Sequence, residues 1–214
     1  TSPSFVKKIE ERKAAWTGEK SKVVYWPQYA EAFYHPAEKR PLPDVEEDDS
    51  FKIVFTGNVG YAQGLDILPR VAEQLMRRGC SCRFYIIGDG RYAPKLKEEI
   101  AQRGVGEMFR LLGRKKPEEI PGYLAHFDAA FLSFADNPLF EMTIPAKLQS
   151  YMACGMPIIA VAKGETRRVI EEADCGVCFS FEETEEVIDR IDLMQKKLNG
   201  DHTRFSRNAV EYSK

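Results

Sequence analysis

The sequence predicts an α/β fold with a doubly wound, mostly parallel, Rossmann-like sheet. After residue 50, short runs rich in β-branched and aromatic residues alternate with segments of helix length, the order typical of such sheets. Several of the runs are continuously apolar, as expected for parallel strands buried on both faces. With 214 residues, 43% hydrophobic and 30% charged, the chain can form one globular domain with a substantial core.

Six runs are strand candidates: residues 52–57, 83–88, 109–113, 129–134, 157–162 and 176–181. The helix candidates are 62–78, 92–103, 117–127, 145–154, 165–173 and 183–198. In segment 62–78 the apolar residues trace one helical stripe, which we expect Gly79 to end. Ligands of such sheets bind beyond the carboxyl ends of the strands. That rule selects five loops: 57–64, 88–92, 113–117, 135–145 and 162–166.

The two ends of the chain fall outside this repeating pattern. "SFVKKIEERKAAW" predicts an amphipathic helix, "KVVYWP" a short strand, and "HPAEKRPLPDVEEDDS" a charged, proline-rich linker. We therefore interpret residues 1–49 as the remnant of a preceding domain with its linker. Residues 50–197 form the repeating domain, and 198–214 a C-terminal helix that is cut short.

Charge and cysteine usage narrow the function classes. A net charge of −2 gives no general attraction to nucleic acid, so an anion site must be local. The five cysteines fit reduced thiols, and the Cys175–Cys178 pair lacks the second pair that a zinc site needs. The longest apolar stretch, "PIIAVA", is too short to span a bilayer. We expect no nucleic acid partner, no metal and a cytoplasmic location.

The loop "FTGNVGYAQGLD" joins the first strand to the first helix. Its glycines, Gly57, Gly60 and Gly64, have G-x-x-G-x-x-x-G spacing, which differs from the dinucleotide fingerprint G-x-G-x-x-G. One interpretation is structural, with the glycines relieving crowding and allowing close helix–sheet packing. The other is that amides around Gly60 and a helix starting near Gln63 point at a phosphate.

A second candidate feature is the helix that Pro145 is suited to begin. It places Lys147 in the first turn, where the helix dipole disfavours a cation unless an anion binds there. Ser150 would share a face with Lys147, while Leu148 would face the core. The alternative is a solvated lysine, or one paired with Glu141.

Two further loops carry polar side chains at the ligand edge. A carboxylate at Glu141 could accept hydrogen bonds from sugar hydroxyls, or it could be an ordinary exposed residue. Arg114, Lys115 and Lys116 could attract phosphate, or they could form a solvated turn before the helix that starts at Pro117.

Taken in order, these segments resemble the C-terminal, donor-binding domain of a retaining, family 4-type bacterial glycosyltransferase, one half of a GT-B fold. The nearest resemblance is to enzymes of capsule, O-antigen and exopolysaccharide synthesis. It covers roughly residues 50–197, and "IPAKLQSYMACGMPIIA" is its most specific part. The other motifs are "GNVGYAQGLDIL", "IIGDG", "LLGRKKPEEIPGYLAHFDAAFLSF" and "GETRRVIEEADCGVCF".

The resemblance implies a set of site residues. It assigns the donor diphosphate to Gly60, Gln63, Lys147 and Leu148, the base to Gly113, Arg114 and Lys115, and the sugar to Glu141, Met142, Thr143 and Ile144. Lys147 and Glu141 are the implied catalytic residues, because a fixed cation helps most as charge grows on the leaving diphosphate. No metal or other cofactor is implied.

This chain departs from the family pattern at three positions. Asn58 and Gln63 stand at or near places where many relatives carry an Arg and a Lys, which shifts the electrostatic task onto Lys147. The second family glutamate, which reaches the ribose, aligns with Ser150, a shorter side chain.

The resemblance also implies partners. They are a nucleoside-diphosphate sugar, with a UDP-sugar favoured, a polysaccharide or lipid-linked acceptor, and an N-terminal acceptor domain outside this chain, without which we expect little turnover. The full-length enzyme could associate with the inner membrane face. The alternatives are a sugar-nucleotide epimerase of the same architecture, a noncatalytic nucleotide-binding module and, against the glycine spacing, a dehydrogenase. An epimerase needs a histidine near the cleft, whereas His35, His126 and His202 lie outside the ligand loops.

Overall fold

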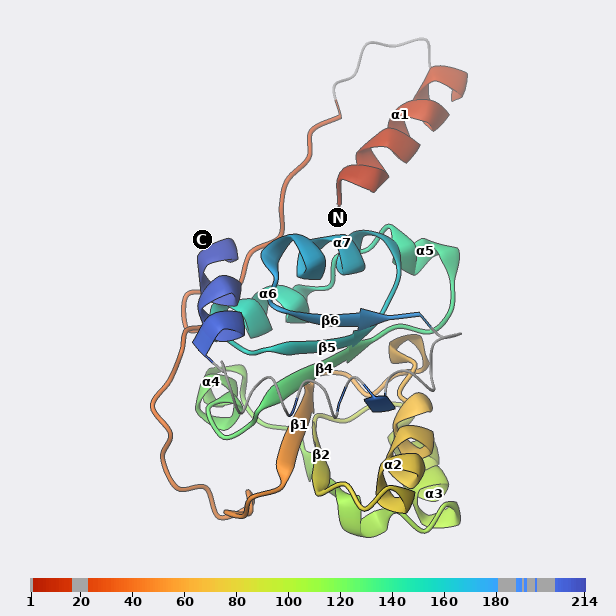
Figure 1. Ribbon diagram of the computed structural model, residues 1–214. Coiled ribbons are helices and arrows are strands. Elements are labelled where there is room, and N and C mark those ends of the chain that lie inside the picture. Colours follow the sequence, from red (N-terminus) through yellow and green to blue (C-terminus); the bar gives the residue numbers. More distant parts are fainter. Residues whose placement is uncertain (1, 17–22, 181–187, 190, 192–194, 196–202) are drawn as a thin grey trace.

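The computed structural model describes residues 2–16, 23–180, 188, 189, 191, 195 and 203–214. Its strands form one parallel sheet in the order β3-β2-β1-β4-β5-β6 (Figure 1). The strands are β1 Phe51–Thr56, β2 Cys82–Ile87, β3 Phe109–Gly113, β4 Ala129–Ser133, β5 Ile158–Val161 and β6 Gly176–Phe179. The order reverses between β1 and β4, so the predicted doubly wound Rossmann-like fold is confirmed.

The helices are α1 Pro3–Trp16, α2 Ile67–Arg77, α3 Ala93–Gln102, α4 Ile120–Leu124, α5 Pro138–Glu141, α6 Ala146–Ala153 and α7 Gly164–Ala173, followed by a helix over 203–212. They lie on both sides of the sheet, except α1, which projects away from it (Figure 1). Along β1, Ile53 and Phe55 join the apolar cluster under α2 and α3, whereas Val54 joins the opposite cluster under α4, α6 and α7. Successive side chains of β1 therefore point alternately into the two apolar clusters, as the continuously apolar sequence of the strand predicted.

Two local predictions need correction, and a third lies largely outside the described residues. The helix expected over 62–78 begins only at Ile67, after a 3-10 turn at Tyr61–Gln63, because Gly64 adopts a left-handed φ of 58° between them. The strand expected in "KVVYWP" is wrong for its described residues, 23–27, which form no strand. The helix expected over 183–198 falls largely outside the described residues.

Loop 135–145 contains a short helix, α5, that the sequence analysis did not anticipate. The Asn137 side chain accepts a hydrogen bond from the Leu139 amide (2.9 Å), and Pro138 follows as the first helical residue. Asn at the N-cap with Pro at the next position is a known helix-start signal, so this helix was predictable.

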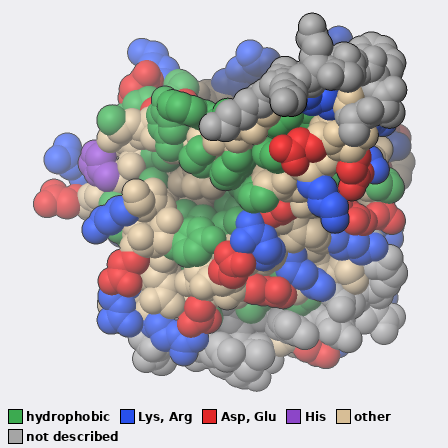
Figure 2. All heavy atoms as spheres, turned by 90° about the horizontal axis from the view of Figure 1, so that it is seen from above, with side chains coloured by type: hydrophobic (Ala, Val, Ile, Leu, Met, Phe, Trp, Pro, Cys, Tyr) green, Lys and Arg blue, Asp and Glu red, His purple; other side chains and the backbone are tan. Residues whose placement is uncertain are grey.

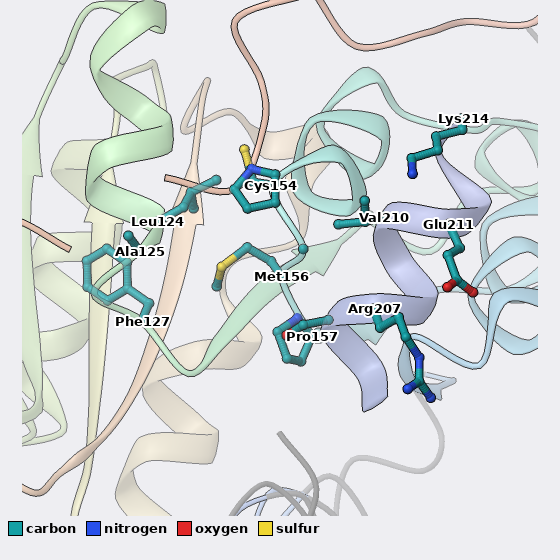
Figure 3. A pocket seen from close by; sticks show the side chains of 13 residues that line it. Leu124, Ala125, Phe127, Cys154, Met156, Pro157, Arg207, Val210, Glu211 and Lys214 are labelled. Atoms are coloured by element: carbon teal, nitrogen blue, oxygen red, sulfur yellow. The ribbon is translucent and has the colours of Figure 1, made fainter. Parts of the chain in front are cut away.

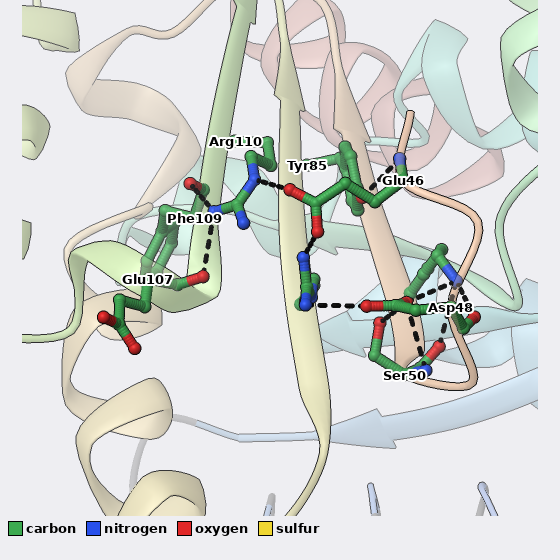
Figure 4. A network of polar contacts seen from close by, with 9 residues as sticks. Glu46, Asp48, Ser50, Tyr85, Glu107, Phe109 and Arg110 are labelled. Carbon is green, nitrogen blue, oxygen red and sulfur yellow. Dashed lines mark hydrogen bonds and ion pairs between the residues drawn. The ribbon is translucent and has the colours of Figure 1, made fainter. Parts of the chain in front are cut away.

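The charged linker is attached to the sheet by ion pairs (Figure 4). Glu46 pairs with Arg83 and with Arg110 (2.5 Å), and Asp48 pairs with Arg83 (2.6 Å) and Lys52 (3.0 Å). The Glu46 amide also donates to the buried Tyr85 hydroxyl (3.3 Å). Together these contacts fix the segment just before β1 against β2 and β3.

The chain between α1 and the linker leaves apolar side chains exposed. Residues 23–30 form no helix or strand, and Val24, Tyr25 and Tyr29 are exposed. On the face seen in Figure 2, hydrophobic side chains also gather around a hollow with charged side chains about it. Exposed apolar surface of this kind is typical of contact surfaces between domains or proteins.

Tyr151 ties α6 to the end of β1 from a fully buried position. Its hydroxyl accepts hydrogen bonds from the Thr56 amide (2.8 Å) and the Thr56 hydroxyl (3.2 Å). In Tyr151→Phe the buried amide loses its acceptor, which should lower the free energy of unfolding by about 1–3 kcal/mol in urea titrations. Tyr29→Phe, at an exposed position, is the control and should leave it unchanged. Equal stability of both variants would contradict this role.

Candidate functional site

Three neighbouring strands reach glycines at the carboxyl edge of the sheet. Gly57 follows β1, Gly88 follows β2 and Gly113 ends β3, with φ values of 112°, 147° and 65°. The Gly57 amide donates to the Ile87 carbonyl and the Gly88 amide to the Gly113 carbonyl, both at 2.8 Å. A methyl group on Gly88 would lie 1.8 Å from the Gly57 oxygen. This edge therefore admits no side chain at Gly88, and the backbone itself faces the space above it.

Above these glycines lies a cleft of about 400 Å³. Its lining residues come from the ends of β1, β2 and β3, the start of α4 and the linker: Tyr34, Thr56, Gly57, Asn58, Ile87, Gly88, Asp89, Arg114, Lys115, Pro117 and Ile120. It occupies the ligand-binding edge expected for a doubly wound sheet. A hollow of about 470 Å³ lies at the other edge, near Pro157 and Phe127, which precede β5 and β4, and beside Val210 (Figure 3).

Lys147 enters the site from the first turn of α6, as predicted, although Pro145 is the N-cap and the helix begins one residue later, at Ala146. Its ammonium donates to the Gln63 side-chain oxygen (2.6 Å) and lies 3.9 Å from the centroid of the Phe55 ring. A methyl group on Gly57 would be 3.9 Å from the same nitrogen. Although the residue as a whole is half-buried, its charged end is shielded from water, and this burial lowers the pKa of Lys147 to about 7.

This arrangement excludes the pairing of Lys147 with Glu141 and gives Gly64 a packing role, while phosphate binding by Lys147 and the first loop stays a prediction. In the described residues, the hydrogen-bond partner of Lys147 is Gln63 rather than Glu141. Gly64 has a packing role, because a methyl group there would lie 2.7 Å from the Phe134 carbonyl oxygen at the end of β4. Gly60 precedes the 3-10 turn that ends in Gln63.

The residues assigned to the sugar lie beyond β4, outside the cleft. Glu141 is exposed and lines a small separate hollow with Asp136 and Lys163. The Met142 amide donates to Leu139 (3.3 Å) and the Thr143 amide to Phe140 (3.0 Å). The side chain of Ile144 is buried. Contact of these residues with a sugar stays a prediction.

Two of the three cations that follow β3, Lys115 and Arg114, face carboxylates. Lys115 donates to Asp44 (2.6 Å), a hydrogen bond that raises the pKa of Lys115, and lies 5.0 Å from the Tyr123 ring centroid. Arg114 is exposed, with its Nε 3.7 Å from Asp89. Gly113, Arg114 and Lys115 thus meet at the cleft edge, but Lys115 is an ion-pair partner rather than a free cation.

The two remaining predicted residues lie along α6. Leu148 is buried, and its amide donates to the Pro145 carbonyl (3.0 Å). Ser150 donates to the Ala146 carbonyl (3.4 Å). Burial raises the pKa of Tyr34, while a hydrogen bond with Ser150 lowers it. Tyr34 lines the cleft and hydrogen-bonds to Ser150, so Ser150 lies behind Tyr34 and does not itself line the cleft.

Sequence reasoning missed Tyr34 and Asp89, which line the cleft, and Asp44, which pairs with the cleft residue Lys115. Asp89 follows β2 within "IIGDG", and a carboxylate at a strand end was a usable signal. Tyr34 lies just before the linker and Asp44 within it, and both are far in sequence from the strand ends that they approach, so no local pattern indicates these contacts.

The family model described as "Glycosyl transferases group 1" matches residues 37–212. The chain belongs to this family. Among curated proteins, the family relatives include alpha-D-kanosaminyltransferase of Streptomyces kanamyceticus, 24% identical over 147 residues, which are 69% of this chain and 37% of the relative. The amylovoran biosynthesis glycosyltransferase AmsK of Erwinia amylovora is 27% identical over 126 residues, 58% of this chain and 31% of the relative. The chain spans about a third of these relatives.

Solved structures share the fold. The pneumococcal O-GlcNAc transferase GtfA, in complex with UDP and GlcNAc, has a TM-score of 0.71 at 12% identity, covering 100% of this chain and 40% of that one. WaaG, involved in lipopolysaccharide biosynthesis, has a TM-score of 0.68 at 14% identity, covering 87% and 50%. Anabaena HepE with UDP-glucose has a TM-score of 0.64 at 17% identity, covering 100% and 48%. At these identities the likeness shows the fold.

The described residues show neither a membrane-spanning helix nor a cluster of metal ligands. None of their helices is long and apolar enough to cross a membrane. They contain no group of three or more His, Cys, Asp or Glu side chains arranged for a metal ion. All five cysteines are free thiols, and burial raises the pKa of Cys175 and Cys178 to about 12, which keeps both protonated.

Proposed function

We propose that this chain is the donor-binding domain of a retaining glycosyltransferase and that its cleft binds a nucleoside-diphosphate sugar, preferentially a UDP-sugar. The observation that carries the proposal is the pairing of a glycine-rich backbone edge with Lys147. A diphosphate needs close approach to amides and a cation. In the described residues no carboxylate pairs with the Lys147 ammonium, which lies beside Gly57.

The order of the strand ends suggests how the donor lies. The diphosphate would rest over Gly57 and the start of the 57–64 loop, the base toward Gly113 at the β3 end, and the sugar toward Glu141 beyond β4. As the glycosidic bond to the diphosphate breaks, negative charge grows on the leaving oxygen. Lys147 would stabilise that charge in the transition state more than in the ground state, which is the condition for catalysis.

The acceptor would be held by a further domain of the same protein. The exposed Val24, Tyr25 and Tyr29 support this, because apolar side chains of that size are typically covered in the assembled molecule. We propose a polysaccharide or lipid-linked acceptor, in line with the amylovoran biosynthesis glycosyltransferase among the relatives, and a site of action at the cytoplasmic membrane face. The proposed chemistry needs neither a metal nor another cofactor.

The positions of the described histidines argue against the epimerase alternative, which needs a histidine near the cleft. The buried ring of His126 hydrogen-bonds to the Arg40 carbonyl (2.6 Å), and neither His126 nor His35 lines the cleft. His202 lies outside the described residues.

Isothermal titration calorimetry on this chain tests the proposal. We expect UDP and UDP-sugars to bind more tightly than GDP-mannose or ADP, and NAD to give no signal. UMP should bind about 10-fold or more weakly than UDP, since it lacks the phosphate that pairs with Lys147. Addition of EDTA should leave the UDP affinity unchanged. Absence of binding by every nucleoside diphosphate at millimolar concentration would refute the proposal.

A further inference from the structure

We propose that Gln63 is a positioning residue, which holds the Lys147 amine beside Gly57 until the donor arrives and then releases it to the diphosphate. This inference rests on the proposed function, because it concerns the same phosphate site. It differs from a direct contact between Gln63 and phosphate, since Gln63 acts here through Lys147.

The geometry places the lysine between two uncharged partners. The Gln63 oxygen is 2.6 Å from Nζ, and the Phe55 ring centroid is 3.9 Å from it. Neither partner carries a charge that the diphosphate would have to displace. A phosphate forms stronger, charge-assisted hydrogen bonds than an amide oxygen, so it can displace the Gln63 oxygen from the Lys147 ammonium.

The backbone of Gln63 is itself fixed from several sides. Its carbonyl accepts a hydrogen bond from the Ser133 hydroxyl at the end of β4, and its amide donates to Gly60 (3.0 Å). The next residue, Gly64, lies against Phe134, and the Ala135 amide donates to Ala62 (3.0 Å). A fixed backbone with a short side chain gives the Lys147 amine a defined position.

Charged groups on the elements around the site are engaged with other residues. Asp89 on the β2 loop faces Arg114 (3.7 Å), and Asp44 on the linker pairs with Lys115 (2.6 Å). Glu141 beyond β4 is exposed in its own hollow.

Burial alone lowers the pKa of Lys147 to about 7. A lysine in this state takes up a proton when an anion binds, so donor binding should be coupled to proton uptake just above neutral pH.

A carboxylate at position 63 would change this coupling in a measurable way. In Gln63→Glu an ion pair would protonate Lys147 before the donor binds and would compete with the diphosphate. Gln63→Met keeps the length of the side chain but removes the oxygen. Gln74→Glu, on α2 outside the cleft, adds the same charge as a matched control.

The experiment measures UDP affinity and proton uptake by calorimetry, in buffers of different ionisation enthalpy, between pH 7.0 and 8.5. A pKa of about 7 in the free protein predicts that affinity of the parent falls about 15-fold over this range, with proton uptake. Gln63→Glu should bind about 10-fold more weakly at pH 7.0, with no proton uptake and a flat pH profile. Gln63→Met should bind about 5-fold more weakly and keep the uptake. Gln74→Glu should match the parent.

The outcomes separate the two proposals. If the parent binds no nucleoside diphosphate at millimolar concentration, the proposed function fails and this inference fails with it. If the parent binds UDP but Gln63→Met equals it in affinity, only the positioning role is overturned. The positioning role is also overturned if Gln63→Glu weakens binding while keeping the parent's proton uptake, because the glutamate would then act on the phosphate directly.

Discussion

Replacing Lys147 by methionine is expected to remove most UDP binding and, at the same time, to stabilise the domain. Truncating one partner of a close charge pair typically costs 2–5 kcal/mol, so UDP affinity should fall about 100-fold, equivalent to ~3 kcal/mol. The methionine side chain can keep the contact with the Phe55 ring through its sulfur. Calorimetric titration of the variant at pH 7.0 measures the loss.

The gain in stability follows from the direction of the pKa shift. Burial lowers the pKa of Lys147 to about 7, below the usual value of a lysine in the unfolded chain. Between these two values the unfolded state binds more protons, so this group makes the parent protein more stable as pH rises. The advantage of Lys147→Met should therefore be largest at pH 7 and below, and it should vanish near pH 10.5.

Thermal unfolding of both proteins at pH 6.5, 8.0 and 10.0 tests that dependence. Lys95→Met, at an exposed position on α3, serves as the control and should change neither the melting temperature nor UDP affinity. Lys147→Arg keeps a charge that cannot be lost, so it should recover part of the binding and none of the stability. A Lys147→Met protein that melts earlier than the parent at pH 6.5 would contradict the buried, desolvated position of the lysine.

The fold could be predicted from the sequence because strands that are buried on both faces of a sheet are continuously apolar. All six strands of the sheet were visible as short runs such as "KIVFTG", whose residues alternate between the two apolar clusters. "KVVYWP" has the same local composition, yet its described residues 23–27 form no strand. Local composition indicates that a segment could pair in a sheet, but it does not indicate whether the chain brings that segment alongside a strand.

The position of a site residue was predictable only where it depends on neighbouring residues in one short segment. Pro145 and Lys147 lie two residues apart, so helix chemistry alone placed the lysine in the first turn. The partner of Lys147 is 84 residues away, and Asp44 is 71 residues from Lys115. Such contacts depend on how the strands are ordered, and for this reason the sequence could suggest Glu141 but could not select Gln63.

Gly88→Ala is expected to be the most destabilising of the substitutions considered. A methyl group there would lie 1.8 Å from the Gly57 oxygen and 2.8 Å from its carbonyl carbon, and both are backbone atoms. Neither strand can move aside easily, because the Gly57 and Gly88 amides are bonded to the neighbouring strands at 2.8 Å. The φ of 147° adds strain for any side chain. We expect the free energy of unfolding to fall by about 3 kcal/mol or more, measured in urea.

Gly104→Ala separates the clash from the backbone strain. Gly104 also has a positive φ, 66°, but a methyl group on it would meet no atom within 4 Å. Its cost should be the conformational penalty alone, about 1–2 kcal/mol. If both variants lost equal stability, φ strain would account for the whole effect and the close approach of β1 and β2 would not matter. A larger loss for Gly88→Ala would show that the glycine is required where two backbones meet, at the edge from which the proposed diphosphate site is built.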